Sequence, residues 1–224
     1  GLVDKSLLHI DGLEPPRYRL LETTRMFAVE RPRDSADAAV TRHRFCQAMA
    51  ALAVEAEAAL MTMADRPWLQ RYLPDDDNIH SAFEQTCEDQ AVEWAADLAA
   101  AGHLLDDLRS DHQNRSRRLH AAAALLPAAR GLARIKLLQL FTSAFAVTGA
   151  HAGVSRIESA REVLDLSREW GDPYRLYHAL VRLAFVVGIE GDTQEARRLL
   201  AEARGLERAD WPLRAKAMMS RIAG

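Results

Sequence analysis

β-Branched residues are scarce in this chain of 224 residues, which holds 17 Val plus Ile against 40 Ala and 30 Leu. Strands favour β-branched side chains, whereas Ala and Leu are among the best helix formers, so the imbalance excludes an all-β fold. It also argues against an α/β fold, whose buried strands are rich in Val and Ile. We therefore expect an all-α protein. An apolar content of 49% with a net charge of −3 excludes intrinsic disorder.

Cysteine and long apolar runs are also lacking. Cys46 and Cys87 lie about forty residues apart, which argues against a disulfide framework and against a CxxC metal site. No apolar stretch approaches the roughly 20 residues that a membrane-spanning helix needs, and no signal peptide is present. We expect a cytoplasmic protein with reduced thiols and no membrane partner.

Lysine is rare as well, with 3 Lys against 26 Arg. The net charge of −3 and an isoelectric point near 6.3 give no global attraction to nucleic acid. Bidentate recognition of carboxylates or phosphates is one reason for an arginine excess. Codon usage in a GC-rich genome, which also raises Ala, is the explanation we favour. The histidines show no HExxH spacing and no serine lies in GxSxG, so we expect no metal site, no cofactor and no catalytic activity.

Residues 7–21 carry the strand signal of the chain. Apolar and polar residues alternate in two short runs, and Asp11-Gly12 and Pro15-Pro16 separate these runs. This pattern predicts a β-hairpin with a loop longer than two residues. A short helix is expected over residues 22–31, before Pro32.

The rest of the chain predicts one helix after another. Apolar residues recur every three or four positions, which is typical of amphipathic helices. Pro67 and Pro74 are expected to bracket a connector, and Asp75-Asp76-Asp77 to open the next helix, where acids suit the helix dipole. The expected helices cover residues 35–63, 75–87, 89–107, 113–126 and 130–148.

The last third of the chain repeats itself. Leu138, Phe141 and Phe145 match Leu180, Leu183 and Val187 at an offset of 42, and Ala160 and Leu164 match Ala196 and Leu200 at an offset of 36. Paired helices at such a period predict a helical solenoid whose pairs bury their apolar faces against one another. The turn at Gly191-Asp192 and the small residues at Ala160 and Ala196 resemble degenerate tetratricopeptide repeats.

The N-terminal segment carries a more specific resemblance. Residues 2–8 (LVDKSLL) and 17–28 (RYRLLETTRMFA), with a looser match at Asp76-Asp77-Asn78-Ile79, resemble the end of the winged-helix subdomain in bacterial STAND-class ATPases, many of which are transcriptional regulators. The resemblance implies a helix over residues 2–8, then the hairpin, then a tetratricopeptide-like array. Gly1 stands where an initiator Met is expected, so we expect a fragment of a longer protein. ATP, Mg²⁺ and the DNA reader are expected only upstream of residue 1.

The expected organisation has three parts. Residues 1–33 form a winged-helix remnant with the hairpin, residues 34–129 a helical linker with degenerate repeats, and residues 130–224 a truncated tetratricopeptide-like array. In such arrays the first helix of each pair lines a concave groove. Polar side chains recur on that face of the expected helices, so the candidate partner-binding residues are Arg134, Lys136, Tyr174, Arg175, His178 and Arg182.

The groove residues predict recognition of an acidic peptide or an anionic small molecule. An ordinary solvent-exposed face is the simpler interpretation of the same pattern. The predicted function is a non-catalytic sensor or interaction arm that regulates upstream domains of the same chain, with DNA reached only through those domains. One alternative is a constitutive peptide-binding scaffold. Another is a nucleic-acid-contacting arm that uses the hairpin and the arginines at positions 109, 115, 117 and 118, although a mixed solvated surface explains these arginines more simply.

Overall fold

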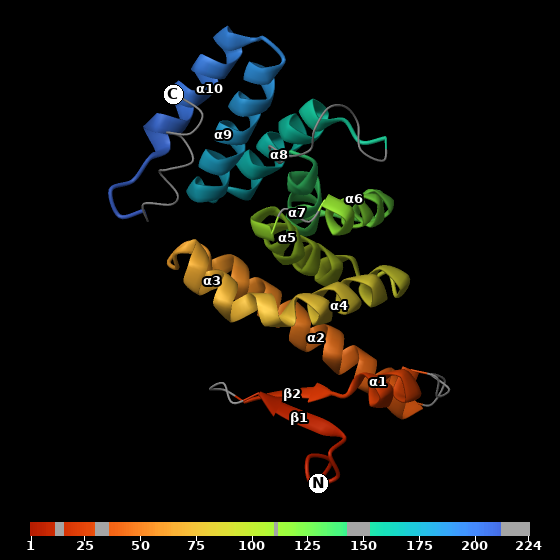
Figure 1. Ribbon diagram of the computed structural model, residues 1–224. Helices are drawn as coiled ribbons and strands as arrows, with labels where there is room; N and C mark the ends of the chain where they lie inside the picture. The colour runs from red at the N-terminus through yellow and green to blue at the C-terminus, as the bar shows by residue number, and fades with distance from the viewer. Residues whose placement is uncertain (12–15, 30–35, 110–111, 143–152, 212–224) are drawn as a thin grey trace. The chain divides into compact units, whose positions relative to one another are not determined.

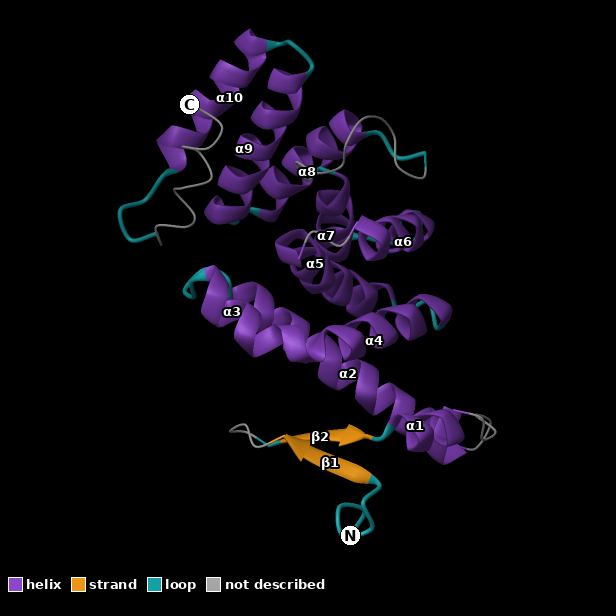
Figure 2. Cartoon of the chain, in the orientation of Figure 1, coloured by secondary structure: helices purple, strands orange, loops and turns teal. Residues whose placement is uncertain are grey.

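The computed structural model describes residues 1–11, 16–29, 36–109, 112–142 and 153–211. Within these residues the chain is mainly helical and carries a small antiparallel sheet of two strands (Figures 1 and 2). The chain divides into two compact units, residues 1–44 and 45–224. The expected helical fold is thus confirmed in its coarse form. No helix among the described residues is long and apolar enough to cross a membrane.

The first unit contains the predicted hairpin. Strands β1 (Leu8–Asp11) and β2 (Arg17–Leu20) pair antiparallel, with Leu8 opposite Leu20 and Asp11 opposite Arg17. Helix α1 (Glu22–Val29) follows, as its sequence predicts. The helix that the resemblance implies over residues 2–8 is wrong, because residues 2–6 form turns and Ser6 adopts a positive φ of 54°, which is incompatible with a right-handed helix.

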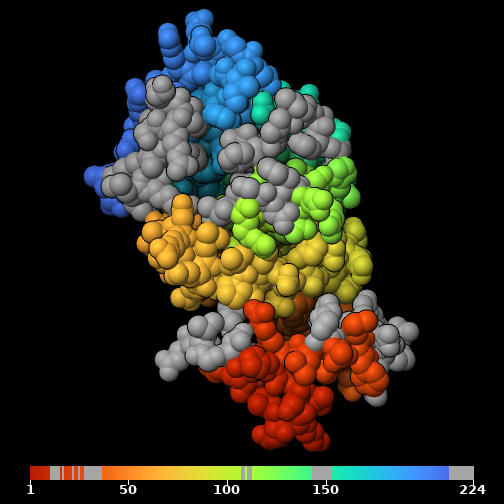
Figure 3. All heavy atoms as spheres, viewed as in Figure 1, coloured from red at the N-terminus to blue at the C-terminus, as the bar shows by residue number. Residues whose placement is uncertain are grey.

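The second unit begins within helix α2 (Ala36–Ala59). The connector expected between Pro67 and Pro74 is wrong, since helix α3 (Asp65–Tyr72) and the short 3₁₀ helix η1 (Leu73–Asp75) occupy this segment. Pro67 lies in the first turn of α3, where a backbone N–H has no intrahelical acceptor and proline therefore costs little. Helix α4 (Asp76–Glu88) begins at the predicted acidic residues. On the face drawn in Figure 3, the atoms of α3 and α4 (orange to yellow) lie side by side.

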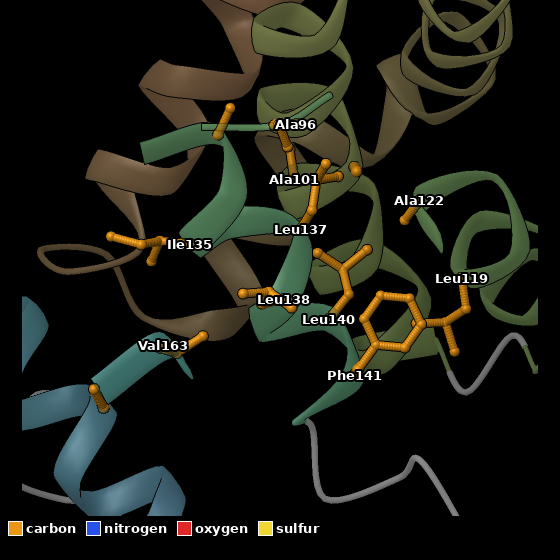
Figure 4. Packing of buried hydrophobic residues seen from close by; sticks show 14 of the residues in the cluster. Ala96, Ala101, Leu119, Ala122, Ile135, Leu137, Leu138, Leu140, Phe141 and Val163 are labelled. Atoms are coloured by element: carbon orange, nitrogen blue, oxygen red, sulfur yellow. The ribbon is translucent and has the colours of Figure 1, made fainter. Parts of the chain in front are cut away.

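Alanine side chains allow the central helices of this unit to pack closely. Helix α5 (Val92–Arg109) contacts α4, α6 (His112–Leu125) and α7 (Gly131–Phe141). Four of the five alanines of α5 are fully buried (Ala95, Ala96, Ala99 and Ala101), and Figure 4 shows Ala96 and Ala101 beside leucines of α7. Methyl side chains keep the helices near each other while the larger leucines fill the spaces between them. The alanine excess of the sequence therefore corresponds to helix–helix contacts.

The last helices pack in chain order: α7 on α8 (Arg156–Trp170), α8 on α9 (Pro173–Ile189), and α9 on α10 (Thr193–Leu206). Two similar junctions separate them. Gly171 and Gly191 take positive φ angles of 77° and 96°, and the aspartate after each accepts a hydrogen bond from a backbone N–H of the next helix. Glycine tolerates this backbone conformation, and aspartate is a favoured N-cap.

The residues matched between the first helices of the two predicted repeats lie in corresponding buried positions, whereas in the second helices Ala160 and Leu164 are buried but Ala196 and Leu200 only half-buried. Leu138 and Phe141 of α7, like Leu180 and Leu183 of α9, are at most 2% exposed. Phe145 lies outside the described residues. The division at residue 130 stays a prediction.

A buried arginine accounts for the glycine in the middle of α5. Arg118 of α6 is 1% exposed; its Nε donates a hydrogen bond to Asp106 Oδ2 at 3.1 Å, and its guanidinium lies 5.3 Å from the centre of the Phe83 ring. A β-carbon added at Gly102 would lie 2.3 Å from the guanidinium carbon of Arg118. Because the ion pair and the ring hold the guanidinium in place, a larger residue at position 102 forces it to move.

We predict that Gly102→Ala destabilises the chain by about 1–3 kcal/mol, the usual cost of overpacking, although alanine is the better helix former. Gly205→Ala is the matched control, because Gly205 lies in α10 with nothing within 4 Å of an added β-carbon. This control should be neutral or stabilise the chain by up to about 1 kcal/mol. Urea denaturation followed by circular dichroism measures both. Equal effects of the two substitutions would contradict the close packing of Arg118 on Gly102.

Candidate ligand-binding site

The six predicted groove residues lie on two helices. Arg134 and Lys136 belong to α7, while Tyr174, Arg175, His178 and Arg182 belong to α9. The apolar residues predicted for the opposite side of α9 are in place, since Leu180, Leu183 and Val187 are buried. The candidate residues of α9 are half-buried instead of fully exposed. They are therefore partly covered by other parts of the chain and partly open to solvent.

Lys136 is the most buried of the candidate residues, with its side chain 4% exposed. Its Nζ donates hydrogen bonds to Glu57 Oε2 of α2 at 2.5 Å and to Asp97 Oδ1 of α5 at 2.7 Å. Two carboxylates thus surround one ammonium group, which offsets the cost of removing this charge from water. Lys136 therefore adds no free positive charge to the groove and acts as a link between three helices.

Arg134 is also neutralised within the chain. Its Nε pairs with Glu162 of α8, and its Nη1 donates a hydrogen bond to the carbonyl oxygen of Leu126 at 2.6 Å. The two cations of α7 therefore offer an acidic partner less positive charge than their sequence positions indicate, because both have acidic partners of the chain within hydrogen-bonding distance. Their role in binding a partner stays a prediction.

Arg175 has a looser environment than the cations of α7. Its Nη2 lies 3.9 Å from Glu57 Oε1, and its side chain is 24% exposed. His178 follows one turn later in α9. Burial, and next the positive charges of Arg182 and Arg175, lower the pKa of His178 from 6.5 to about 3. At neutral pH His178 is therefore an uncharged side chain, and its buried Nδ1 atom has no hydrogen-bond partner among the described residues.

Aromatic rings form one side of the site. Tyr174 lies edge-on to Trp211 with ring centres 5.6 Å apart, and Tyr177 lies edge-on to the same ring at 5.1 Å. Trp68 is likewise a packing residue, since it is fully buried and its indole N–H donates a hydrogen bond to the Ala56 carbonyl oxygen at 2.8 Å. Trp170, at the end of α8, is 52% exposed.

Glu57 and Asp97 are the site residues that the sequence did not indicate. They come from α2 and α5, far along the chain from α9, and each lies within an alanine-rich amphipathic helix. A single acidic residue in such a helix is usually solvated, so its position in the sequence does not predict a binding site. Only the tertiary fold brings both carboxylates to Lys136.

The arginine patch predicted between residues 109 and 118 is half internal, because Arg109 and Arg117 are exposed and the other two arginines are not. Arg115 and Arg118 are 4% and 1% exposed, and Asp106 beside them is 2% exposed. Arg109 pairs with Asp76 at 2.5 Å. The interpretation of this segment as a mixed solvated surface is therefore wrong for Arg115, Arg118 and Asp106. Burial also removes Arg115 and Arg118 from any surface that a nucleic acid reaches, which weakens the nucleic-acid alternative.

Comparisons with known proteins point to bacterial regulators. The chain is 33% identical, over 226 aligned residues, to provisionally named HTH-type transcriptional regulators of Mycobacterium bovis and Mycobacterium tuberculosis. The alignment covers 93% of this chain but only 24% of the relatives, so the chain spans about a quarter of their length. No family model matches the chain. No solved structure matches it either.

His103 of α5 gives a test of the buried polar cluster around Asp106. Burial, followed by the charges of Arg115, Arg118 and Arg182, lowers the pKa of His103 from 6.5 to about 3. The unfolded chain takes up a proton near pH 6.5 and the folded chain does not, so stability is complete above this pH and falls as the pH drops towards 3.

We predict that His103 alone removes about 2 kcal/mol of stability between pH 7 and pH 5, close to 1.4 kcal/mol per pH unit below its unfolded pKa. His103→Gln should lose less stability than the wild type over this interval and keep a constant difference from it between pH 7 and pH 8. Urea denaturation at each pH measures this. Parallel curves from pH 8 to pH 5 would show that His103 accepts a proton in the folded state.

Proposed function

We propose that this chain is a non-catalytic regulatory arm of a larger bacterial transcriptional regulator. The observation that carries the proposal is the 33% identity along 93% of the chain to HTH-type transcriptional regulators about four times as long as the aligned segment. The arm consists of helix pairs of tetratricopeptide type, α7–α8 and α9–α10. In this proposal the hairpin and α1 are the end of a winged-helix subdomain, and the protein is cytoplasmic.

The candidate site supports a sensing role over a purely structural one. Arg175, His178 and Tyr174 are half-buried side chains at a place where α2 also contributes an acid. A protein or small-molecule effector bound there would contact α2 and α9 together. Such contacts favour whichever arrangement of the helices binds the effector better. That preference changes the contacts of the arm with the rest of the regulator, which is the requirement for allosteric control.

ATP, Mg²⁺ and DNA belong, in this proposal, to segments of the regulator other than this chain. The resemblance of residues 2–28 to STAND-class ATPases supports nucleotide hydrolysis as the regulated activity. The arm contributes no catalytic group. The arm acts through the effector that it binds. The binding free energy of this effector differs between the active and the inactive state of the whole protein, and this difference shifts the balance between the two states.

The experiment uses the longer protein that carries this chain, compared with a version that lacks residues 35–224. We predict that the deletion changes the basal rate of ATP hydrolysis and abolishes the response of ATP hydrolysis and DNA binding to cellular extract containing the effector. Steady-state hydrolysis and DNA-binding anisotropy measure these effects. Unchanged basal and stimulated values in the deleted protein would contradict a regulatory role for the arm.

A further inference from the structure

The carboxylate of Glu57 lies near two cations that belong to different helices. Its Oε2 lies 2.5 Å from Lys136 Nζ, while its Oε1 lies 3.9 Å from Arg175 Nη2. A charge-assisted hydrogen bond between nitrogen and oxygen is about 2.8 Å long, so the contact with Lys136 is a closed ion pair and the contact with Arg175 is not. Arg175 is therefore held near a carboxylate without being bound to it.

The two contacts differ in how readily they exchange. Lys136 retains Asp97 at 2.7 Å if Glu57 turns away, so the buried ammonium keeps a carboxylate partner. Arg175 and Glu57 are 24% and 32% exposed, which leaves both side chains accessible to a solute. When the contact between Glu57 and Arg175 is lost, no fully buried charge is left without a partner. The loss of this contact therefore costs little folding free energy.

We propose that Glu57 occupies the position beside Arg175 that a ligand carboxylate takes, so that Arg175 is a carboxylate-binding residue and Glu57 its built-in competitor. This inference rests on the proposed function and specifies the chemistry of its effector. A ligand carboxylate can approach the guanidinium in bidentate geometry, which Glu57 cannot adopt while it is tied to Lys136. Exchange would release Glu57 from α9 and thereby weaken the link between α2 and α9.

The surroundings of Arg175 suit an acid attached to an organic body instead of an inorganic anion. His178 is uncharged at neutral pH, so it does not add a second fixed positive charge. Within the described part of the chain its Nδ1 has no hydrogen-bond partner, so a polar group of the ligand can satisfy this atom. The half-buried Tyr174 ring, 6.3 Å from the His178 ring, offers an apolar surface next to the charge. Acidic peptide side chains and small dicarboxylic acids share the chemistry required.

The test measures binding of two probes to the whole 224-residue chain. One probe is a fluorescein-labelled peptide of six glutamates, followed by anisotropy, and the other is glutarate, followed by calorimetry. We expect Glu57→Gln to bind one of them about tenfold more tightly than the wild type, because the amide keeps a hydrogen bond to Lys136 but no longer competes as an anion. Arg175→Gln should reduce binding at least tenfold. The probe that responds identifies a peptide or a small acid as the ligand class.

Glu202→Gln is the matched control. Glu202 pairs with Arg168 at 2.9 Å on the same unit with a side chain 36% exposed, so its substitution removes the same charge from a closed surface pair. An equal gain in affinity for Glu57→Gln and Glu202→Gln would show that the change in net charge alone explains the tighter binding. This result would overturn the proposal. Absence of binding to both the wild type and Glu57→Gln, or full binding to Arg175→Gln, would also overturn it. These results concern the isolated chain, so they are distinguishable from a failure of the deletion experiment.

Discussion

The buried ammonium group of Lys136 is the constraint on which the second unit depends. A charge removed from water costs several kcal/mol unless it is closely paired. Lys136 meets this requirement with Glu57 of α2 and Asp97 of α5, and its own helix α7 packs against α5 and α8. The same charge therefore fixes the relative positions of three helices that are distant in the sequence. The apolar surface that alanine and leucine bury stabilises the packed helices, and the ion pairs of Lys136 select one arrangement of them.

This constraint also determines what α9 can do. Glu57 is held by Lys136, so Arg175 of α9 has a carboxylate beside it that it does not bind tightly. The site is thus connected to α2, α5 and α7 through a single glutamate. In a regulator, such a connection is the physical requirement for passing a binding event from one helix pair to another. A solvent-exposed lysine at position 136 would break the ion-pair connection from Arg175 through Glu57 to α7 and α5.

Much of the fold could be predicted from local sequence patterns. The alternation around Leu8 and Leu20 predicts the hairpin, and the Gly171-Asp172 and Gly191-Asp192 pairs predict the helix junctions, because each depends on neighbouring residues alone. Pro67 misled the prediction of a connector, since proline is compatible with the first turn of a helix.

The candidate site was only partly predictable. The spacing of Arg175, His178 and Arg182 placed them on one face of a helix, which α9 confirms. Their charge environment depends on Glu57, and the burial of Arg118 depends on the absence of a side chain at Gly102. Both are contacts between separate helices, so no local pattern reports them. The charged residues of the sequence therefore predict a more basic groove and a more exposed group of arginines than the structure has.

The most direct test of the central claim is a double-mutant cycle on Lys136 and Asp97. The unfolding free energies of Lys136→Met, Asp97→Leu and the double variant are measured by urea denaturation at pH 7. If the buried ammonium organises these helices, Lys136→Met leaves two carboxylates without their cation and Asp97→Leu leaves the ammonium with Glu57 alone, and the coupling energy is about 1–3 kcal/mol. A coupling energy within about 0.5 kcal/mol of zero would show that the two side chains act independently, and would contradict this account.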